Sequence, residues 1–203
     1  MEGRGYRWDS LGHNESHGYL VPALLGIMAE TRGERRCFDL GFGNGSVAAA
    51  VTASGWKVSG VDPSDDGVAR AREAYPQLDL HQAAAGPELV EQFGQFPVVY
   101  SLEVVEHVYL PRLFAQTLYA LTAPGGVAIV SSPFHGYWKN LALALSGNLD
   151  KHFTALWDHG HIKFWSVRTL SALLMEAGFK QLEFRRVGRI PALAKSMIAI
   201  ARR

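Results

Sequence analysis

Short strand-type runs alternate with helix-type segments along this 203-residue chain, and this alternation restricts the fold more than any other feature. Alternating strands and helices form βαβ units, which build a parallel sheet with helices on both faces. The predicted strands are 35–40, 56–62, 78–82, 97–103 and 126–133, and the predicted helices are 46–55, 64–75, 111–123 and 166–179. Two further strand-type runs, 180–188 and 194–202, have no helix between them, which predicts an antiparallel hairpin at one sheet edge.

A single domain is expected over residues 1–203, because the length suits one core and no Pro-, Gly- or Ser-rich linker divides the chain. Two segments fall outside the alternation. Residues 1–30 are interpreted as an N-terminal lid or helix, since the stretch 6–19 is aromatic and polar. The irregular, aromatic-rich segment 134–165 is interpreted as an insertion near the functional site.

The charge balance gives little support for a nucleic-acid partner, because the formal net charge is only +1. Charge is uneven, however. Residues 181–203 contain six basic side chains and one acid, Glu183. A solvated edge is the favoured interpretation of this segment, and an anionic substrate or a weak peripheral contact with an anionic membrane surface is the alternative. The sequence gives no prediction of oligomeric state.

The expected compartment is the cytoplasm. Cys37 is the single cysteine, so no internal disulfide can form, which fits a reducing environment. The apolar run 20–28 is interrupted by Pro22 and Gly26 and is too short to cross a bilayer. It also lacks the basic flank and cleavage site of a secretion signal.

A glycine-rich loop, FDLGFGNG, follows the first predicted strand. In an open α/β sheet, ligands bind beyond the carboxyl ends of the strands, so this loop is in a suitable place. A dinucleotide site requires G-x-G-x-x-G, whereas here the glycines are at 41, 43 and 45, and position 46 is serine. No G-x-x-x-x-G-K-[ST] motif is present either, so the sequence does not predict a nucleotide-phosphate loop.

Two acids indicate what the loop binds. Asp39, at the end of the first strand, would repel a pyrophosphate and favour a ligand with an ammonium or sulfonium group. Asp62 ends the second strand, 21 residues after Gly41, where a carboxylate accepts the two hydroxyls of a ribose. A cation together with an unphosphorylated ribose describes S-adenosylmethionine.

The motifs FDLGFGNG, VSGVDPS, PVVYSLEVVEHV, LTAPGGVAIVSSP and GHIKFWSVRTLSALLMEAGF together resemble class I S-adenosylmethionine-dependent methyltransferases. Within that class, SLEVVEHV is similar to the ubiquinone-biosynthesis O-methyltransferases. The resemblance implies a Rossmann-like, doubly wound α/β fold with a seven-stranded sheet, mostly parallel with an antiparallel last strand. Phe42 stands where the family more often has a small residue or cysteine. The predicted cofactor-binding residues are Asp39, Gly41, Phe42, Gly43, Gly45, Asp62, Pro63, Ser101 and Leu102.

The segment EVVEH follows the fourth predicted strand and supplies the candidate catalytic residues. If it forms a helical turn, Glu103, Glu106 and His107 stand at i, i+3 and i+4 on one face. Such a patch suits a divalent cation, or a histidine that acts as general base beside two acids. A third interpretation gives it no catalytic role, with one glutamate on the cofactor, the other solvated and His107 packed beneath a lid. All three stay open.

The insertion supplies the candidate acceptor-binding residues, which are His135, Tyr137, Trp138 and His159. Aromatic and imidazole side chains suit a flat apolar acceptor. The DHGH stretch lacks a trustworthy metal-ligand spacing. His161 is expected to be structural, because it leads directly into the helix that begins near Ser166.

The expected activity is transfer of a methyl group from S-adenosylmethionine to an oxygen of a small phenolic, quinol or lipid-like acceptor, which leaves S-adenosylhomocysteine. N- or C-methylation of another small molecule is the alternative within enzymes. A protein that binds the cofactor without turnover is the alternative outside them, although the intact Asp39, glycine loop and Asp62 count against it.

Overall fold

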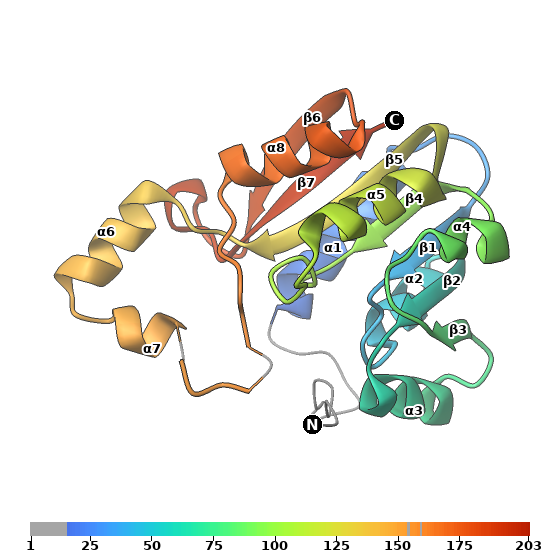
Figure 1. Ribbon diagram of the computed structural model, residues 1–203, viewed down its shortest axis with the longest axis horizontal. Helices are drawn as coiled ribbons and strands as arrows, with labels where there is room; N and C mark the ends of the chain where they lie inside the picture. Colours follow the sequence, from blue (N-terminus) through green and yellow to red (C-terminus); the bar gives the residue numbers. More distant parts are fainter. Residues whose placement is uncertain (1–15, 154, 159) are drawn as a thin grey trace.

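The computed structural model describes residues 16–153, 155–158 and 160–203, and its centre is a seven-stranded sheet (Figure 1). The strand order is β3-β2-β1-β4-β5-β7-β6. The strands are β1 (Arg36–Leu40), β2 (Lys57–Asp62), β3 (Asp79–Gln82), β4 (Phe96–Ser101), β5 (Thr122–Pro133), β6 (Gln181–Val187) and β7 (Ser196–Arg202). Strands β1 to β5 are parallel, and β7 runs antiparallel to both β5 and β6. The predicted mixed sheet and edge hairpin are thus confirmed.

Helices cover both faces of the sheet, as expected for strands that are apolar on both sides. On one face, α1 (His17–Ala29), α2 (Ser46–Ala53) and α3 (Asp65–Ala74) form a core around Trp56 and Tyr100. On the other, α4 (Glu88–Phe93), α5 (Pro111–Leu121) and α8 (Val167–Ala177) form a core around Phe38 and Phe96. Within the described residues, no helix is long and apolar enough to cross a bilayer.

Local signals in the sequence explain several helix ends. The Ser64 hydroxyl accepts a hydrogen bond from the Gly67 N–H at 3.1 Å, so it caps α3. Ser166 and Thr169 form a reciprocal capping box at the start of α8. Gly178, with φ of 117°, ends this helix in the left-handed conformation.

The structure differs from the sequence prediction in four places. Strand β4 ends at Ser101 rather than at residue 103, and β5 begins at Thr122, where a helix end was predicted. The short helix α4 was not predicted. The insertion is also partly helical, with α6 (Tyr137–Leu145) and α7 (Leu149–Phe153). No residue of α6 or α7 is fully buried, so neither helix packs a face into the core.

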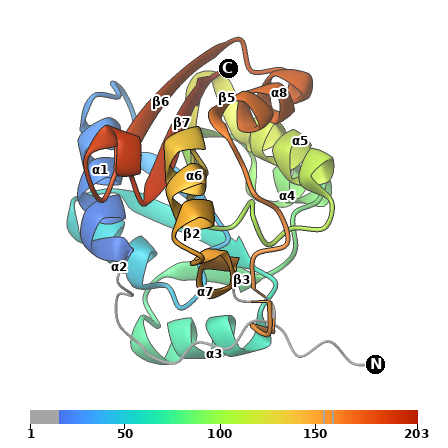
Figure 2. The ribbon, with the colours of Figure 1, turned by 90° about the vertical axis from the view of Figure 1, so that its left-hand side faces the viewer.

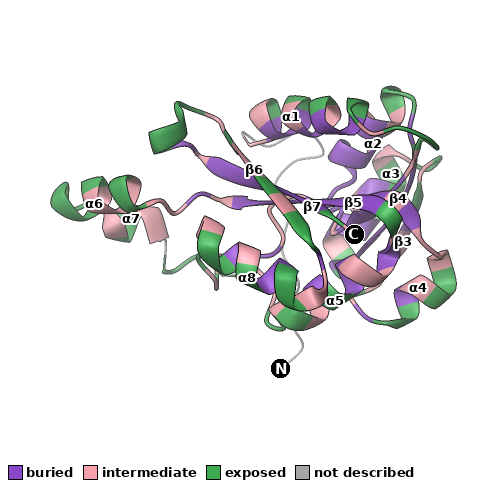
Figure 3. Ribbon diagram, turned by 90° about the horizontal axis from the view of Figure 1, so that it is seen from above, coloured by how far each residue is buried: buried purple, intermediate pink, exposed green. Residues whose placement is uncertain are grey.

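Helices α6 and α7 project from one end of the sheet, whereas α1 packs along it (Figures 2 and 3). Leu20, Leu24 and Met28 of α1 are completely buried, so this part of the predicted N-terminal lid is a core helix. Residues 1–15 of that prediction lie outside the described residues.

Candidate active site

The glycine loop leaves the carboxyl end of β1 in a conformation that requires glycine. Gly41, Gly43 and Gly45 have φ of 98°, 58° and 78°, in the left-handed region that other residues rarely adopt. A Cβ atom on Gly41 would lie 2.6 Å from Cγ2 of Val104, in the loop after β4. The loop is therefore closely packed on one side and presents bare backbone, which allows close approach of a ligand.

Asp62 holds the glycine loop against the end of β2. Its Oδ2 accepts a hydrogen bond from the Gly43 N–H at 2.8 Å, and its Oδ1 accepts one from the Ser64 N–H at 2.8 Å. Burial raises the pKa of Asp62, and these two hydrogen bonds oppose the rise. A carboxylate oxygen has two acceptor positions, so each can accept a further donor, as the predicted ribose contact requires.

Asp39 is a buried acid with an unsatisfied oxygen. It pairs in register with Tyr100 of β4 and is 2% exposed, and its Oδ2 has no hydrogen-bond partner in the described part of the chain. Burial raises the pKa of Asp39 to about 8, the nearby Tyr100 hydroxyl opposes the rise, and the charge of Asp62 adds to it. A buried carboxylate without a partner is a suitable counter-ion for a cationic ligand group.

The side chains of the other predicted cofactor-binding residues differ in burial and in what they contact. The Phe42 side chain is buried in the core against α1 and α2, so only its backbone faces the loop. The Ser101 hydroxyl donates to the Leu40 carbonyl oxygen at 2.5 Å and joins the ends of β4 and β1. Pro63 is exposed and Leu102 is partly buried.

The sequence prediction missed two polar residues at the glycine loop, namely Asn44 and His17. Asn44 is buried, and its Oδ1 accepts a hydrogen bond from the Ser46 N–H at 3.2 Å. The Ser46 hydroxyl lies 3.4 Å from Nδ1 of His17, in the first turn of α1. The Asn-Gly pair at 44–45 is a turn signal that could have identified Asn44, but nothing local connects His17 to the loop.

Glu103 does not start a helical turn, so the predicted single face for Glu103, Glu106 and His107 is wrong. Glu103 has φ of 55°, in the left-handed region. Ser131 of β5 stabilises this conformation, because its hydroxyl accepts from the Glu103 N–H at 2.9 Å and donates to Oε1 at 2.7 Å. Ser196 donates to the other carboxylate oxygen at 3.4 Å. Burial raises the pKa of Glu103 to about 7, although both hydroxyls oppose the rise.

Glu106 and His107 instead meet His161, which the sequence analysis took as structural. Ligand atoms of the three residues all lie within 4.8 Å of one another. The backbone explains the meeting, because the Glu106 carbonyl oxygen accepts hydrogen bonds from the N–H groups of Ile162 and Lys163, both at 3.0 Å. We call Glu106, His107 and His161 the carboxylate–imidazole cluster.

The cluster is buried at its centre. Glu106 is 1% exposed, and neither of its carboxylate oxygens has a hydrogen-bond partner among the described residues. Burial, followed by the charge of Glu103, raises the pKa of Glu106 well above its usual range. Nε2 of His161 lies 3.9 Å from Oε1 of Glu106, and burial lowers the pKa of His161 to about 4. Nδ1 of His107 lies 3.2 Å from the Gly160 carbonyl oxygen.

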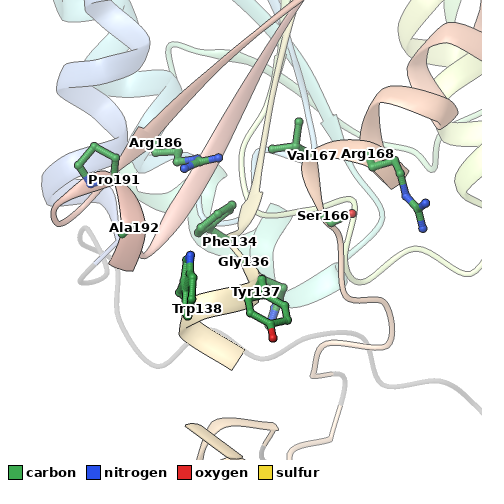
Figure 4. Close-up of a pocket in the computed structure, with 11 residues that line it drawn as sticks. Phe134, Gly136, Tyr137, Trp138, Ser166, Val167, Arg168, Arg186, Pro191 and Ala192 are labelled. Carbon is green, nitrogen blue, oxygen red and sulfur yellow. The ribbon is translucent and has the colours of Figure 1, made fainter. Parts of the chain in front are cut away.

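A cavity of about 630 Å³ opens between α6, α8 and the β6–β7 connection (Figure 4). Three predicted acceptor-binding residues line it, namely His135, Tyr137 and Trp138. Tyr137 and Trp138 are 72% and 68% exposed, so they stand at its open side. None of the predicted cofactor-binding residues lines this cavity. His159, the fourth predicted acceptor residue, lies outside the described residues.

Comparisons with known proteins agree with this geometry. A family model described as a methyltransferase domain matches residues 13–183. The ubiquinone biosynthesis O-methyltransferase of Aromatoleum aromaticum is 28% identical over 182 residues, which cover 87% of this chain and 78% of that protein. The protein of the same name from Caulobacter sp. (strain K31) is 36% identical over 116 residues, so that match covers 55% of this chain and 46% of the relative.

A solved structure shows the same fold. The S-adenosylmethionine-dependent methyltransferase from Archaeoglobus fulgidus superposes with a TM-score of 0.66 at 15% identity, over 91% of this chain and 93% of that one. The family match covers most of the chain and includes the glycine loop, Asp62 and the carboxyl end of β4. The chain therefore belongs to the methyltransferase-domain family, as a class I S-adenosylmethionine-dependent methyltransferase.

Proposed function

We propose that the protein transfers the methyl group of S-adenosylmethionine to a hydroxyl group of a small phenolic, quinol or lipid-like acceptor. The observation that supports this most is the presence of two buried acids, Asp39 and Asp62, at the same sheet edge as the carboxylate–imidazole cluster. The names of the matched relatives support oxygen as the methylated atom. Several of those relatives are about twice as long as the matched segment, so the acceptor is our inference for this chain.

The cofactor is expected to place its charged end against Asp39 and its ribose against Asp62. The unsatisfied Oδ2 of Asp39 would then gain a cationic partner. The left-handed glycines between the two acids let the ligand approach the backbone closely. Because the sulfonium is already a good leaving group, alignment with the acceptor supplies much of the rate.

The acceptor hydroxyl must lose its proton, and we propose that the carboxylate–imidazole cluster removes it. If Nδ1 of His107 donates to the Gly160 carbonyl oxygen, the lone pair of the neutral ring is on Nε2, which can accept the proton. Glu106 lies beside this ring and, in its ionised form, would stabilise the imidazolium that forms, while His161 packs against the same ring. The carboxylate of Glu103 is engaged by Ser131 and Ser196, so Glu103 affects the cluster through its charge and not by direct contact.

The same cluster also fits a divalent cation, which is the second interpretation. A carboxylate with two unsatisfied oxygens and two imidazoles is a plausible donor set for such an ion. Glu106, His107 and His161 would hold it, and a bound cation would lower the pKa of the acceptor hydroxyl. Glu103, which the sequence analysis included among the ligands, is not part of this set.

Calorimetry with S-adenosylhomocysteine, followed by a methyl-transfer screen with phenols and quinols, tests the proposal. We expect a 1:1 complex and an O-methylated product, which mass spectrometry and NMR would identify. Methylation at nitrogen or carbon would support the alternative enzyme. Cofactor binding without turnover over a broad acceptor panel would contradict the proposal. Loss of activity with EDTA and recovery with Mg²⁺ or Zn²⁺ would favour the cation over the base.

A further inference from the structure

Basic side chains gather around the acceptor cavity without acids to pair with them. Arg168 and Arg186 line the cavity, and no acidic residue does. Lys139, on α6, donates to the Phe134 carbonyl oxygen at 2.9 Å. Burial, followed by the charge of Arg189, lowers the pKa of Lys139, and the charge of Glu103 opposes this. Within the part of the chain that the structure describes, none of these four side chains forms an ion pair.

The structure divides the basic segment 181–203 into two groups. Arg185 pairs with Glu30 at 2.8 Å and with Glu183 at 3.1 Å, so its charge is compensated. The Arg203 guanidinium donates to carbonyl oxygens at the end of α5, including that of Tyr119 at 3.0 Å. These two side chains have structural partners, whereas Arg186 lines the cavity and Arg189 lies near Lys139, and neither forms an ion pair with a described residue. Part of the positive charge of this segment therefore lies uncompensated beside the cavity.

The remaining walls of the cavity are mainly apolar. Phe134, Trp138, Val167, Pro191 and Ala192 are among its lining residues. The guanidinium carbon of Arg186 lies 4.7 Å from the centre of the Phe134 ring, so the charged group is stacked on an apolar surface. Figure 4 shows Arg186 directed toward the other labelled residues, whereas Arg168 points away from them. A stacked guanidinium keeps its edge N–H groups available for a planar anion.

We propose that the cavity binds an acceptor that combines an apolar body with an anionic oxygen group, and that Arg186 binds this group. The inference rests on the proposed function, because it assumes that the cavity receives the methyl acceptor. A carboxylate or phosphate would form charge-assisted hydrogen bonds with the guanidinium, while the apolar walls bury the body. Lys139 and Arg189 add attraction for an anion and disfavour a cationic acceptor.

Matched pairs of probes test this charge preference. The pairs are 3-phenylpropanoate with 3-phenylpropanamide, and dodecanoate with dodecan-1-ol, each titrated in the presence of saturating S-adenosylhomocysteine. Trp138, which lines the cavity, provides a fluorescence signal, and calorimetry provides a second readout. We expect at least one anion to bind fivefold or more tightly than its neutral partner. Arg186→Gln should abolish that preference and leave the affinity of the neutral partner unchanged.

Arg72→Gln is the matched control, because Arg72 is exposed on α3, away from the lining residues, and the substitution removes the same charge. It should leave the preference intact. Both variants should bind S-adenosylhomocysteine with the wild-type affinity, so failure of cofactor binding would be recognised as a failure of the proposed function instead. If neither anion is preferred over its neutral partner, or if Arg186→Gln weakens both members of a pair equally, the inference is wrong.

A lipid headgroup is the other source of an anionic oxygen group, and vesicles distinguish it from a soluble acceptor. Flotation with phosphatidylglycerol vesicles is compared with flotation with phosphatidylcholine vesicles, for wild type and Arg186→Gln. Binding to the soluble anions without preferential flotation supports the inference. Arg186-dependent flotation without binding of either soluble anion would overturn it in favour of the weak membrane contact considered from the sequence.

Discussion

The protonation of Asp39 should make cofactor affinity depend on pH. With its pKa raised to about 8 by burial, this carboxyl group is mainly neutral in the free protein at pH 7. A cationic ligand group beside it requires the ionised form, so binding must release the proton. At pH 7, about 0.9 of the molecules carry the proton, and affinity should therefore rise about 0.9 log units per pH unit.

The size of the change in affinity follows from the fractions of protonated and ionised Asp39 at each pH. If the bound complex keeps Asp39 ionised down to pH 6, S-adenosylhomocysteine should bind about 50-fold more weakly at pH 6 than at pH 8. This requires a pKa shift of about three units, or about 4.1 kcal/mol. An ammonium about 4 Å from a carboxylate gains about 4 kcal/mol at an effective dielectric constant of 20, so a direct contact is sufficient.

Calorimetry between pH 6 and 8 measures this dependence. Asp39→Asn is the decisive control, because the amide has the same shape and no charge in this range. We expect the variant to bind more weakly at pH 8 and to show a nearly flat profile. Asp62, whose pKa is also raised by burial, would act in the same direction and remains intact in the variant. An unchanged pH slope in Asp39→Asn, or a flat profile in wild type, would refute the reasoning.

Three further predictions concern the other site residues. Asp62→Ala should weaken S-adenosylhomocysteine by about 1.5–3 kcal/mol, the scale of charge-assisted hydrogen bonds, and unchanged calorimetric affinity in a folded variant would remove the ribose assignment. Gly43→Val, at φ of 58°, should abolish cofactor binding in a protein that circular dichroism shows to be folded, and normal binding would mean that the loop has another role. His107→Ala should lower turnover about 100-fold with cofactor affinity nearly intact, and normal turnover would exclude it as the base.

The arrangement of the sheet could be predicted because its signals are local. Alternating strand and helix patterns specify parallel pairing, and the connection between the last two strand-type runs is too short for a crossover helix, which specifies the hairpin. The positions of Asp39 and Asp62 follow from the ends of two neighbouring strands. In these cases the residues that determine the conformation are close to one another in the sequence.

The geometry around Glu103 and the carboxylate–imidazole cluster could not be predicted in the same way, because distant residues determine it. EVVEH has helical spacing, but Ser131, 28 positions later, holds Glu103 in a left-handed conformation. His161 reaches Glu106 through backbone hydrogen bonds of the residues that follow it. The buried position of Phe42 likewise depends on α1, whose packing against the loop has no local signal. Long-range contacts of this kind determine the conformation even where the spacing of residues in the sequence suggests a different one.

The position of β7 between β5 and β6 also has a consequence during synthesis. β6 leaves the ribosome before β7, yet β6 pairs with β7 in the sheet, and β7 also covers the long edge of β5. Until β7 emerges, β5 presents an apolar edge with unpaired N–H and C=O groups, and β6 has no strand to join. Open edges of this kind pair readily with other chains. A nascent chain that stalls before Ser196 is therefore the form of this protein most exposed to aggregation, and the one with most need of a chaperone.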